Sequence, residues 1–204
     1  MKSYVLTADI AGSAQLPPAK LKKAIALAKI CLSALRQNFG AEASEIFRGD
    51  SMQSVWTKNG TKALAGAIWL VLKFKANEYH LRLGFGMGNI RLFTGKPATS
   101  NGEAFVISGS LLDEMKNTSQ LIRIGSTFEN DLEWKAHSAA LNYILERCTL
   151  AQSAVLSHAL ENKTQQEIAG ILNIRQPAVS QHLQAAGWPA IQAILLRFEY
   201  IAGT

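Results

Sequence analysis

The sequence predicts an α+β fold in two parts, a ferredoxin-like sheet domain over residues 1–125 and an all-helical domain over residues 126–204. The first observation is the order of the predicted strands and helices along the chain. This order, β-α-β-β-α-β followed by α-β, is typical of a ferredoxin-like sheet with its helices on one face. The second is that every pattern after Gly125 has helical periodicity. We therefore expect a domain boundary near residue 126.

The predicted strands are short β-rich runs bounded by turn residues. They cover residues 3–10, 44–48, 52–57, 79–90 and 121–124. Gly49 and Asp50 join the second and third strands as a hairpin. Along the fourth strand Gly84, Gly86 and Gly88 share one face, so we expect another element to pack closely against it.

Helices are predicted where apolar residues recur at steps of three and four. In the first part they cover residues 18–39, 61–76 and 103–117, with a loop at 94–102. In the second part they cover residues 128–147, 149–161, 164–172, 176–186 and 188–201.

Composition limits the possible classes of protein. Apolar residues make up 48% of the 204, which suffices for real cores, and no apolar run is long enough to span a membrane. The start lacks the zones of a signal peptide, so we expect a cytoplasmic protein. Cys31 and Cys148 lie far apart in apolar helical contexts, which favours two buried thiols over a zinc site.

The net charge of +6 is unevenly distributed. Residues 1–125 hold 16 Lys and Arg against 8 Asp and Glu, whereas residues 126–204 hold 5 against 7. The basic excess therefore lies in the sheet domain, where it suits a DNA backbone or an anionic ligand such as a nucleotide.

The segment from Thr164 to Leu183 has the pattern of a helix-turn-helix. Thr164 and Glu167 form a capping box, Asn173 suits a left-handed turn, and Gly187 ends the second helix. The apolar residues that join the two helices are Ile168, Leu172, Ile174, Val179 and Leu183. The segment resembles the helix-turn-helix units of bacterial regulators; the alternative is an ordinary helical hairpin that packs on the other domain.

The second helix of this unit would enter the major groove of DNA by its N-terminal end. Glutamine pairs with adenine, arginine pairs with guanine or phosphate, and the N-terminus of the first helix suits a phosphate. We therefore predict DNA contacts from Thr164, Gln165, Gln166, Arg175, Gln176, Ser180, Gln181 and Gln184. Because one unit reads only a half-site, we expect a homodimer.

Four motifs in the order ADIAGS (8–13), FRGDSMQSVW (47–56), LRLGFGMGNI (81–90) and NGEAFVISGSLLDEM (101–115) resemble those of SatD-family proteins. That family couples such a domain to a C-terminal helix-turn-helix. The same series is more distantly similar to the catalytic domain of class III nucleotidyl cyclases. The resemblance implies a nucleotide-cyclase-like domain joined to a DNA-binding unit.

The resemblance to cyclases implies a site for Mg²⁺ or Mn²⁺ with a nucleotide, in which Asp9 and Asp50 hold the metal. The residues alone leave open that Asp9 caps the next segment and that Asp50 only makes its turn. Phosphate contacts are expected from the backbone at Ile10, Ala11, Gly12 and Ser13 and from Arg48 or Lys96. Glu103 is either a third carboxylate or a helix-start residue, and Arg82 is either a phosphate ligand or a surface residue.

The sequence departs from the cyclase pattern where cyclases place a catalytic Asn and Arg. Here the matching positions hold Val106 and Ser110, which cannot stabilise the transition state. We therefore expect a cytoplasmic DNA-binding regulator whose first domain senses a nucleotide or similar anion without catalysis. The alternatives are an active nucleotidyl cyclase or related metal-dependent nucleotidyltransferase with a regulatory helix-turn-helix, and a protein-interaction module.

Overall fold

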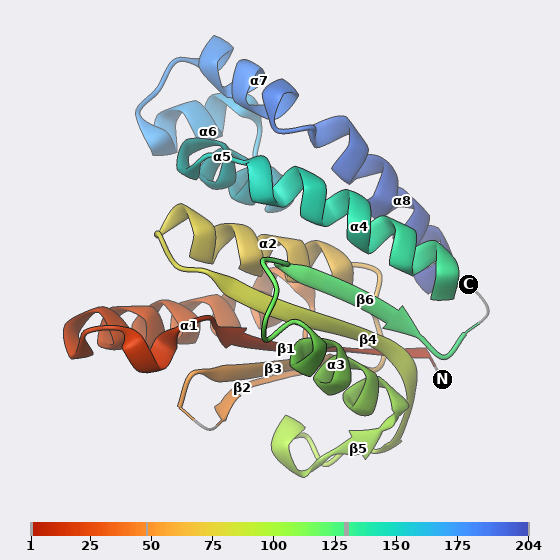
Figure 1. Cartoon of the computed structure of the whole chain (residues 1–204). Coiled ribbons are helices and arrows are strands. Elements are labelled where there is room, and N and C mark those ends of the chain that lie inside the picture. Colours follow the sequence, from red (N-terminus) through yellow and green to blue (C-terminus); the bar gives the residue numbers. More distant parts are fainter. Residues whose placement is uncertain (1, 48, 129–130, 204) are drawn as a thin grey trace.

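The computed structural model describes residues 2–47, 49–128 and 131–203. The elements of its α+β part appear in the predicted order (Figure 1). They are β1 (Lys2–Ile10), α1 (Pro18–Phe39), β2 (Ala43–Phe47), β3 (Ser51–Trp56), α2 (Ala63–Ala76), β4 (Leu81–Leu92), β5 (Asn101–Gly102), α3 (Glu103–Glu114) and β6 (Ile122–Ser126). The helices that follow are α4 (Asp131–Arg147), α5 (Leu150–Leu160), α6 (Gln165–Leu172), α7 (Gln176–Ala185) and α8 (Trp188–Gly203).

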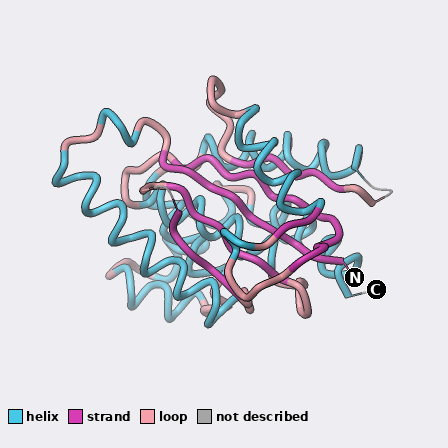
Figure 2. The backbone as a smooth tube through the Cα atoms, turned by 90° about the horizontal axis from the view of Figure 1, so that it is seen from below, coloured by secondary structure: helices cyan, strands magenta, loops and turns pink. Residues whose placement is uncertain are grey.

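The strands pair in the order β2-β3-β1-β4, all antiparallel, as expected for a ferredoxin-like arrangement. β6 joins the free edge of β4 in parallel, and the short β5 pairs with the far end of β4. Figure 2 shows the strands side by side in a curled sheet surrounded by helices. The prediction of a mixed α+β fold is thus confirmed, although the predicted loop at 94–102 contains β5 and the third helix ends at Glu114 rather than near 117.

The prediction that the helices share one face of the sheet is wrong for α3. Apolar side chains of β1 and β4 pack toward α1 and α2, whereas α3 lies on the opposite face (Figure 1). The cause is the glycine face of β4: a Cβ on Gly84 would lie 2.1 Å from the Ser108 carbonyl, and one on Gly86 would lie 2.2 Å from that of Ala104. The missing side chains let the backbone of α3 rest directly on the strand.

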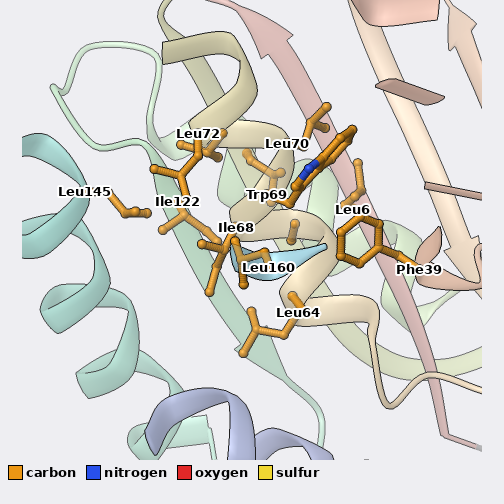
Figure 3. Packing of buried hydrophobic residues seen from close by; sticks show 14 of the residues in the cluster. Leu6, Phe39, Leu64, Ile68, Trp69, Leu70, Leu72, Ile122, Leu145 and Leu160 are labelled. Carbon is orange, nitrogen blue, oxygen red and sulfur yellow. The ribbon is translucent and has the colours of Figure 1, made fainter. Parts of the chain in front are cut away.

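The core continues from the sheet into the C-terminal helices. Helix α2 is apolar around its whole circumference, and it is buried between the sheet and α5. Figure 3 shows Leu64, Ile68 and Trp69 of α2 packed together with Phe39 of α1 and Leu160 of α5. The predicted boundary near residue 126 therefore separates two kinds of secondary structure that share one hydrophobic core.

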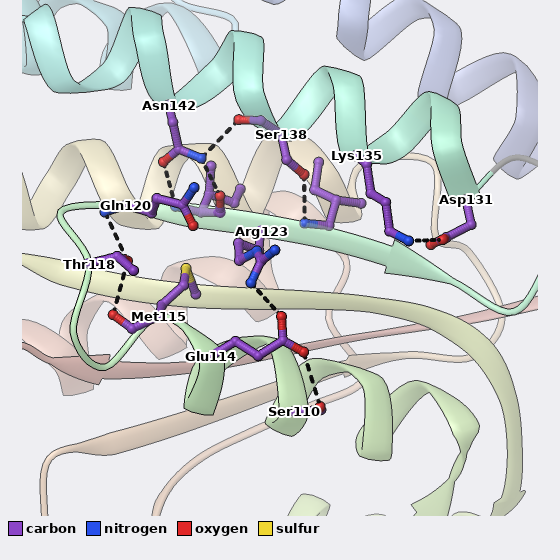
Figure 4. Close-up of polar contacts among 12 residues, drawn as sticks. Ser110, Glu114, Met115, Thr118, Gln120, Arg123, Asp131, Lys135, Ser138 and Asn142 are labelled. Atoms are coloured by element: carbon purple, nitrogen blue, oxygen red, sulfur yellow. Dashed lines mark hydrogen bonds and ion pairs between the residues drawn. The ribbon is translucent and has the colours of Figure 1, made fainter.

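Helix α4 also closes the outer edge of β6 (Figure 4). The hydroxyl of Ser138 accepts a hydrogen bond from the Ile124 amide at 2.8 Å. The side-chain oxygen of Asn142 accepts from the amides of Leu121 and Ile122 at 2.8 and 3.1 Å. These side chains satisfy backbone groups that an edge strand would otherwise leave exposed, and they join the two parts of the chain by polar contacts.

The structure also describes the two cysteines and the lengths of the apolar helices. Cys31 and Cys148 are both buried as free thiols, as predicted, and burial raises the pKa of Cys31 to about 12. Within the described part of the chain, no helix is long and apolar enough to cross a membrane.

Candidate functional sites

The N-terminus of α6 has the predicted capping box. The Glu167 amide donates to Thr164 Oγ1 at 3.3 Å, and the Thr164 amide donates to Glu167 Oε2 at 2.7 Å. These hydrogen bonds from Thr164 hold the pKa of Glu167 below its ordinary value, so this carboxylate stays charged. The start of α6 is therefore set by two residues three positions apart.

The turn between α6 and α7 is also local in origin. Asn173 adopts the left-handed conformation, with φ 52° and ψ 46°, and its amide caps the end of α6. Ile168, Val179 and Leu183 are buried where the two helices meet. The pair therefore has the capping, turn and apolar contacts that its sequence predicts.

Most of the residues predicted to contact DNA are exposed on α6 and α7. Arg175, Gln176, Gln181 and Gln184 are exposed, and Ser180 is half-buried. On α6, Thr164 and Gln166 are exposed and Gln165 is half-buried. The Gln176 amide group donates to Gln165 Oε1, which brings the N-termini of the two helices together.

No acidic residue occurs between residues 168 and 198. The exposed side of α7 is consequently polar without negative charge, despite the acidic balance of the C-terminal part as a whole. Such a side can approach a phosphate backbone without like-charge repulsion.

Glu161, which follows α5, adds polar contacts to the apolar packing of α5 on α2. Its carboxylate accepts a 2.8 Å hydrogen bond from the Trp69 indole and lies 3.3 Å from Lys73 Nζ, both on α2. It also lies 3.1 Å from His158 Nδ1. Burial raises the pKa of Glu161, but these partners outweigh it and hold the pKa below its ordinary value. Sequence reasoning gave this cluster no role.

The second candidate site lies at the end of the sheet where β1 ends. Ala8 of β1 pairs with Met52 of β3, so Asp9 and Asp50 occur at the same end of neighbouring strands. Asp9 pairs with Arg82 in the register between β1 and β4. The fold therefore places two carboxylates and one guanidinium at this end of the sheet.

Asp9 forms a bidentate ion pair with Arg82. Arg82 Nε lies 2.9 Å from Asp9 Oδ1, and Nη2 lies 2.9 Å from Oδ2. Arg82 Nη1 donates to the Lys116 carbonyl at 2.8 Å, just after α3. The two side chains are 15% and 14% exposed, so the pair is largely removed from water. Arg82 is therefore neither a free phosphate ligand nor an ordinary surface residue.

The predicted phosphate loop is only partly available. The Ala11 amide already donates to the His80 carbonyl at 2.9 Å, and Ile10 is buried in β1. Gly12 adopts the left-handed conformation with φ 69°, and Ser13 begins a short 3-10 turn over Ser13–Gln15. Of the two predicted basic partners, Arg48 lies outside the described residues and Lys96 is exposed in the loop between β4 and β5.

Glu103 does not approach Asp9, because the two residues lie toward opposite ends of the sheet. Glu103 accepts from the Asn89 amide at 3.0 Å and from Thr127 Oγ1 at 3.1 Å, and the Asn89 and Thr127 hydrogen bonds lower its pKa. The reading of Glu103 as a helix-start residue fits this geometry. On α3, Val106 is exposed, and Ser110 makes a long 3.5 Å hydrogen bond to Glu114.

The residues present do not fit a Mg²⁺ or Mn²⁺ site. Both carboxylate oxygens of Asp9 are held by Arg82, whereas such a metal requires oxygen ligands free to surround it. Within residues 2–47, 49–128 and 131–203, no three His, Cys, Asp or Glu side chains are grouped so that they could hold a metal ion.

Solved structures that resemble the chain include several nucleotidyl cyclases. One is a bacterial light-regulated adenylyl cyclase, with 14% identity and a TM-score of 0.45 over 61% of this chain and 75% of that one. Another is an adenylate/guanylate cyclase/hydrolase from Silicibacter pomeroyi, with 20% identity and a TM-score of 0.46 over 55% and 69%. A third is the adenylyl cyclase CyaB from P. aeruginosa, with 14% identity and a TM-score of 0.43 over 69% and 79%. No protein-family model matches the chain, and no curated protein matches it in sequence.

Proposed function

We propose that this protein is a DNA-binding transcriptional regulator in which α6 and α7 form a helix-turn-helix and α7 is the recognition helix. The observation that carries the proposal is the exposed polar side of α7, free of acidic residues and adjoining the N-terminus of α6. Glutamine and arginine side chains at the start of such a helix suit base edges and phosphates.

The affinity of one such unit is expected to be low, because the C-terminal part carries few basic residues. A homodimer would double the contacts and read two half-sites. The basic sheet domain would add attraction to the DNA backbone that does not depend on sequence.

For the α+β domain we propose a role as a sensor of a nucleotide or similar anion, as in the SatD-like arrangement that the motifs resemble. Its basic excess and the amides at Gly12 and Ser13 support an anionic ligand. A ligand would change DNA affinity if it favours one arrangement of the helices over another.

An active nucleotidyl cyclase or nucleotidyltransferase is the alternative, and no contact among the described residues favours it. Asp9 is occupied by Arg82, and Val106 and Ser110 stand where the cyclase pattern has its catalytic Asn and Arg. If the purified chain converted a nucleoside triphosphate into a cyclic product, and Asp50→Ala abolished that conversion, the sensor proposal would fail.

The DNA proposal is tested by fluorescence anisotropy with the DNA upstream of the protein's own coding sequence and with a shuffled duplex of equal length. We expect tighter binding to the upstream DNA, and a log–log salt dependence whose slope reflects the phosphates neutralised. Equal affinity for both duplexes at each salt concentration would contradict the regulator proposal.

A further inference from the structure

Each oxygen of the Asp9 carboxylate has a hydrogen-bond partner within the chain. Arg82 donates to each of its two oxygens at 2.9 Å, and the pairing of β1 with β4 puts the two residues opposite each other. Bidentate pairs of this kind are the strongest and most directional that a carboxylate forms with a side chain.

Arg82 is itself held in place by a third segment. Its Nη1 donates to the Lys116 carbonyl, so the guanidinium joins β1, β4 and the turn that follows α3. With 14% of its side chain exposed, Arg82 cannot leave Asp9 without breaking two hydrogen bonds in a largely buried place, and the third, to Lys116, restrains it further.

We infer that Arg82 is the permanent counter-ion of Asp9 and that it excludes divalent cations from this site. The guanidinium occupies one acceptor position on each carboxylate oxygen and places a fixed positive charge beside Asp9, which repels a metal cation. Asp50, half-buried in the hairpin turn, is then the one carboxylate left of the two that the implied metal site would use.

One consequence rests on the proposed sensor function. An anionic ligand of the α+β domain would bind without a metal, because the metal that normally accompanies a nucleotide triphosphate has no place beside Asp9. The exclusion of the metal itself depends neither on that function nor on DNA binding.

The test measures Mn²⁺ binding to the full chain by electron paramagnetic resonance of the free ion. The variants are Asp9→Asn, Arg82→Gln and the double variant, and Arg91→Gln serves as a matched control because Arg91 is an exposed arginine on the same strand. We expect no difference in Mn²⁺ binding among the unaltered chain, Asp9→Asn and Arg91→Gln. Arg82→Gln should bind Mn²⁺ at least about tenfold more tightly, and adding Asp9→Asn should remove that gain.

Two results would overturn the inference. One is Mn²⁺ binding by the unaltered chain that Asp9→Asn abolishes. The other is a folded Arg82→Gln variant that gains no Mn²⁺ binding.

A second measurement covers the case in which Arg82→Gln does not fold. In the unaltered chain, the Nε–H resonance of Arg82 should be protected from exchange and should neither shift with Mg²⁺ nor broaden with Mn²⁺. Saturable shifting or broadening of that resonance would also overturn the inference. DNA binding is measured separately, so failure here leaves the regulator proposal to be judged by its own experiment.

Discussion

The two candidate sites differ in how far apart in sequence their determining residues lie. In the α6–α7 pair, Thr164 and Glu167 set the start and Asn173 sets the turn, all within ten positions. At the end of β1, the role of Asp9 is decided by Arg82, which is 73 positions away. A local motif therefore predicts its own geometry, whereas a carboxylate in a sheet acquires its chemistry from whichever residue the strand pairing places beside it.

The largest effect is expected from breaking the Asp9–Arg82 pair. Arg82→Gln leaves a carboxylate without its counter-ion in a largely buried place and should lower the free energy of unfolding by about 3 kcal/mol, the lower end for buried pairs. Urea unfolding monitored by circular dichroism measures the loss. Arg123→Gln is the control, because the Arg123–Glu114 pair shown in Figure 4 is 34% and 51% exposed and should be worth about 0–1 kcal/mol. Equal losses from both variants would mean that the two pairs do not differ as their burial implies.

The next effect concerns the exposed side of α7. Gln181→Ala should weaken binding to the specific DNA by about 1–3 kcal/mol, as loss of a bidentate base contact does, and leave nonspecific binding nearly unchanged. Arg175→Ala, if Arg175 binds phosphate, should weaken binding to all sequences and reduce the salt slope by about one. Anisotropy titrations separate the two patterns. Gln37→Ala, an exposed glutamine on α1, should change neither quantity.

A smaller effect separates folding from DNA contact. Thr164→Ala and Thr149→Ala each remove a capping box, the first from α6 and the second from α5, and each should lower stability by about 1 kcal/mol. Only Thr164→Ala should also weaken DNA binding, because Thr149 is not among the predicted contacts. Stability comes from urea melts and affinity from anisotropy; a matching loss of affinity in Thr149→Ala would show that the effect acts through stability alone.

Much of the fold was predictable because its signals are local. The order of strands and helices along the chain followed from local sequence patterns. The glycine face of β4 correctly indicated close packing, although α3, the element packed there, lies on the face opposite α1 and α2. The shared core had a signal in the apolar sequence of α2, since a helix without a polar side must be covered all round. The boundary predicted near residue 126 rested on secondary structure alone and therefore did not take this long-range packing into account.

The pairing of Asp9 with Arg82 was harder to predict, because it requires the register between β1 and β4. A partial signal existed: each residue is the single charge within the apolar, buried stretch of its strand, and isolated buried charges require partners. Glu161 had no such signal. Its partners Trp69 and Lys73 lie on α2, and only the packing of α5 against that helix brings them together.

The smallest effect is expected where Glu161 and His158 lie beside α2, and it depends on pH. Burial, followed by the nearby Lys73, lowers the pKa of His158 below its ordinary value of 6.5 despite its contact with Glu161. The unfolded chain therefore binds the proton more readily than the folded chain, so stability should fall as pH drops below about 6.5. Thermal melts between neutral and mildly acidic pH measure the slope.

His158→Gln should reduce that slope, because glutamine does not titrate, while it keeps a polar group beside Glu161; His80, whose pKa burial also lowers, accounts for the slope that remains. A slope unchanged in the variant would exclude His158 as its source. Glu161 titrates in a lower range: because its pKa lies below the ordinary 4.5, the stability it contributes is lost only as pH falls through that region. The pH range in which His158 titrates and the lower range in which Glu161 titrates can thus be separated in one series of melts. DNA affinity is measured over the same series. If it stays constant while stability falls with the protonation of His158, the contacts of Glu161 stabilise the packing of α5 on α2 without controlling the exposed side of α7.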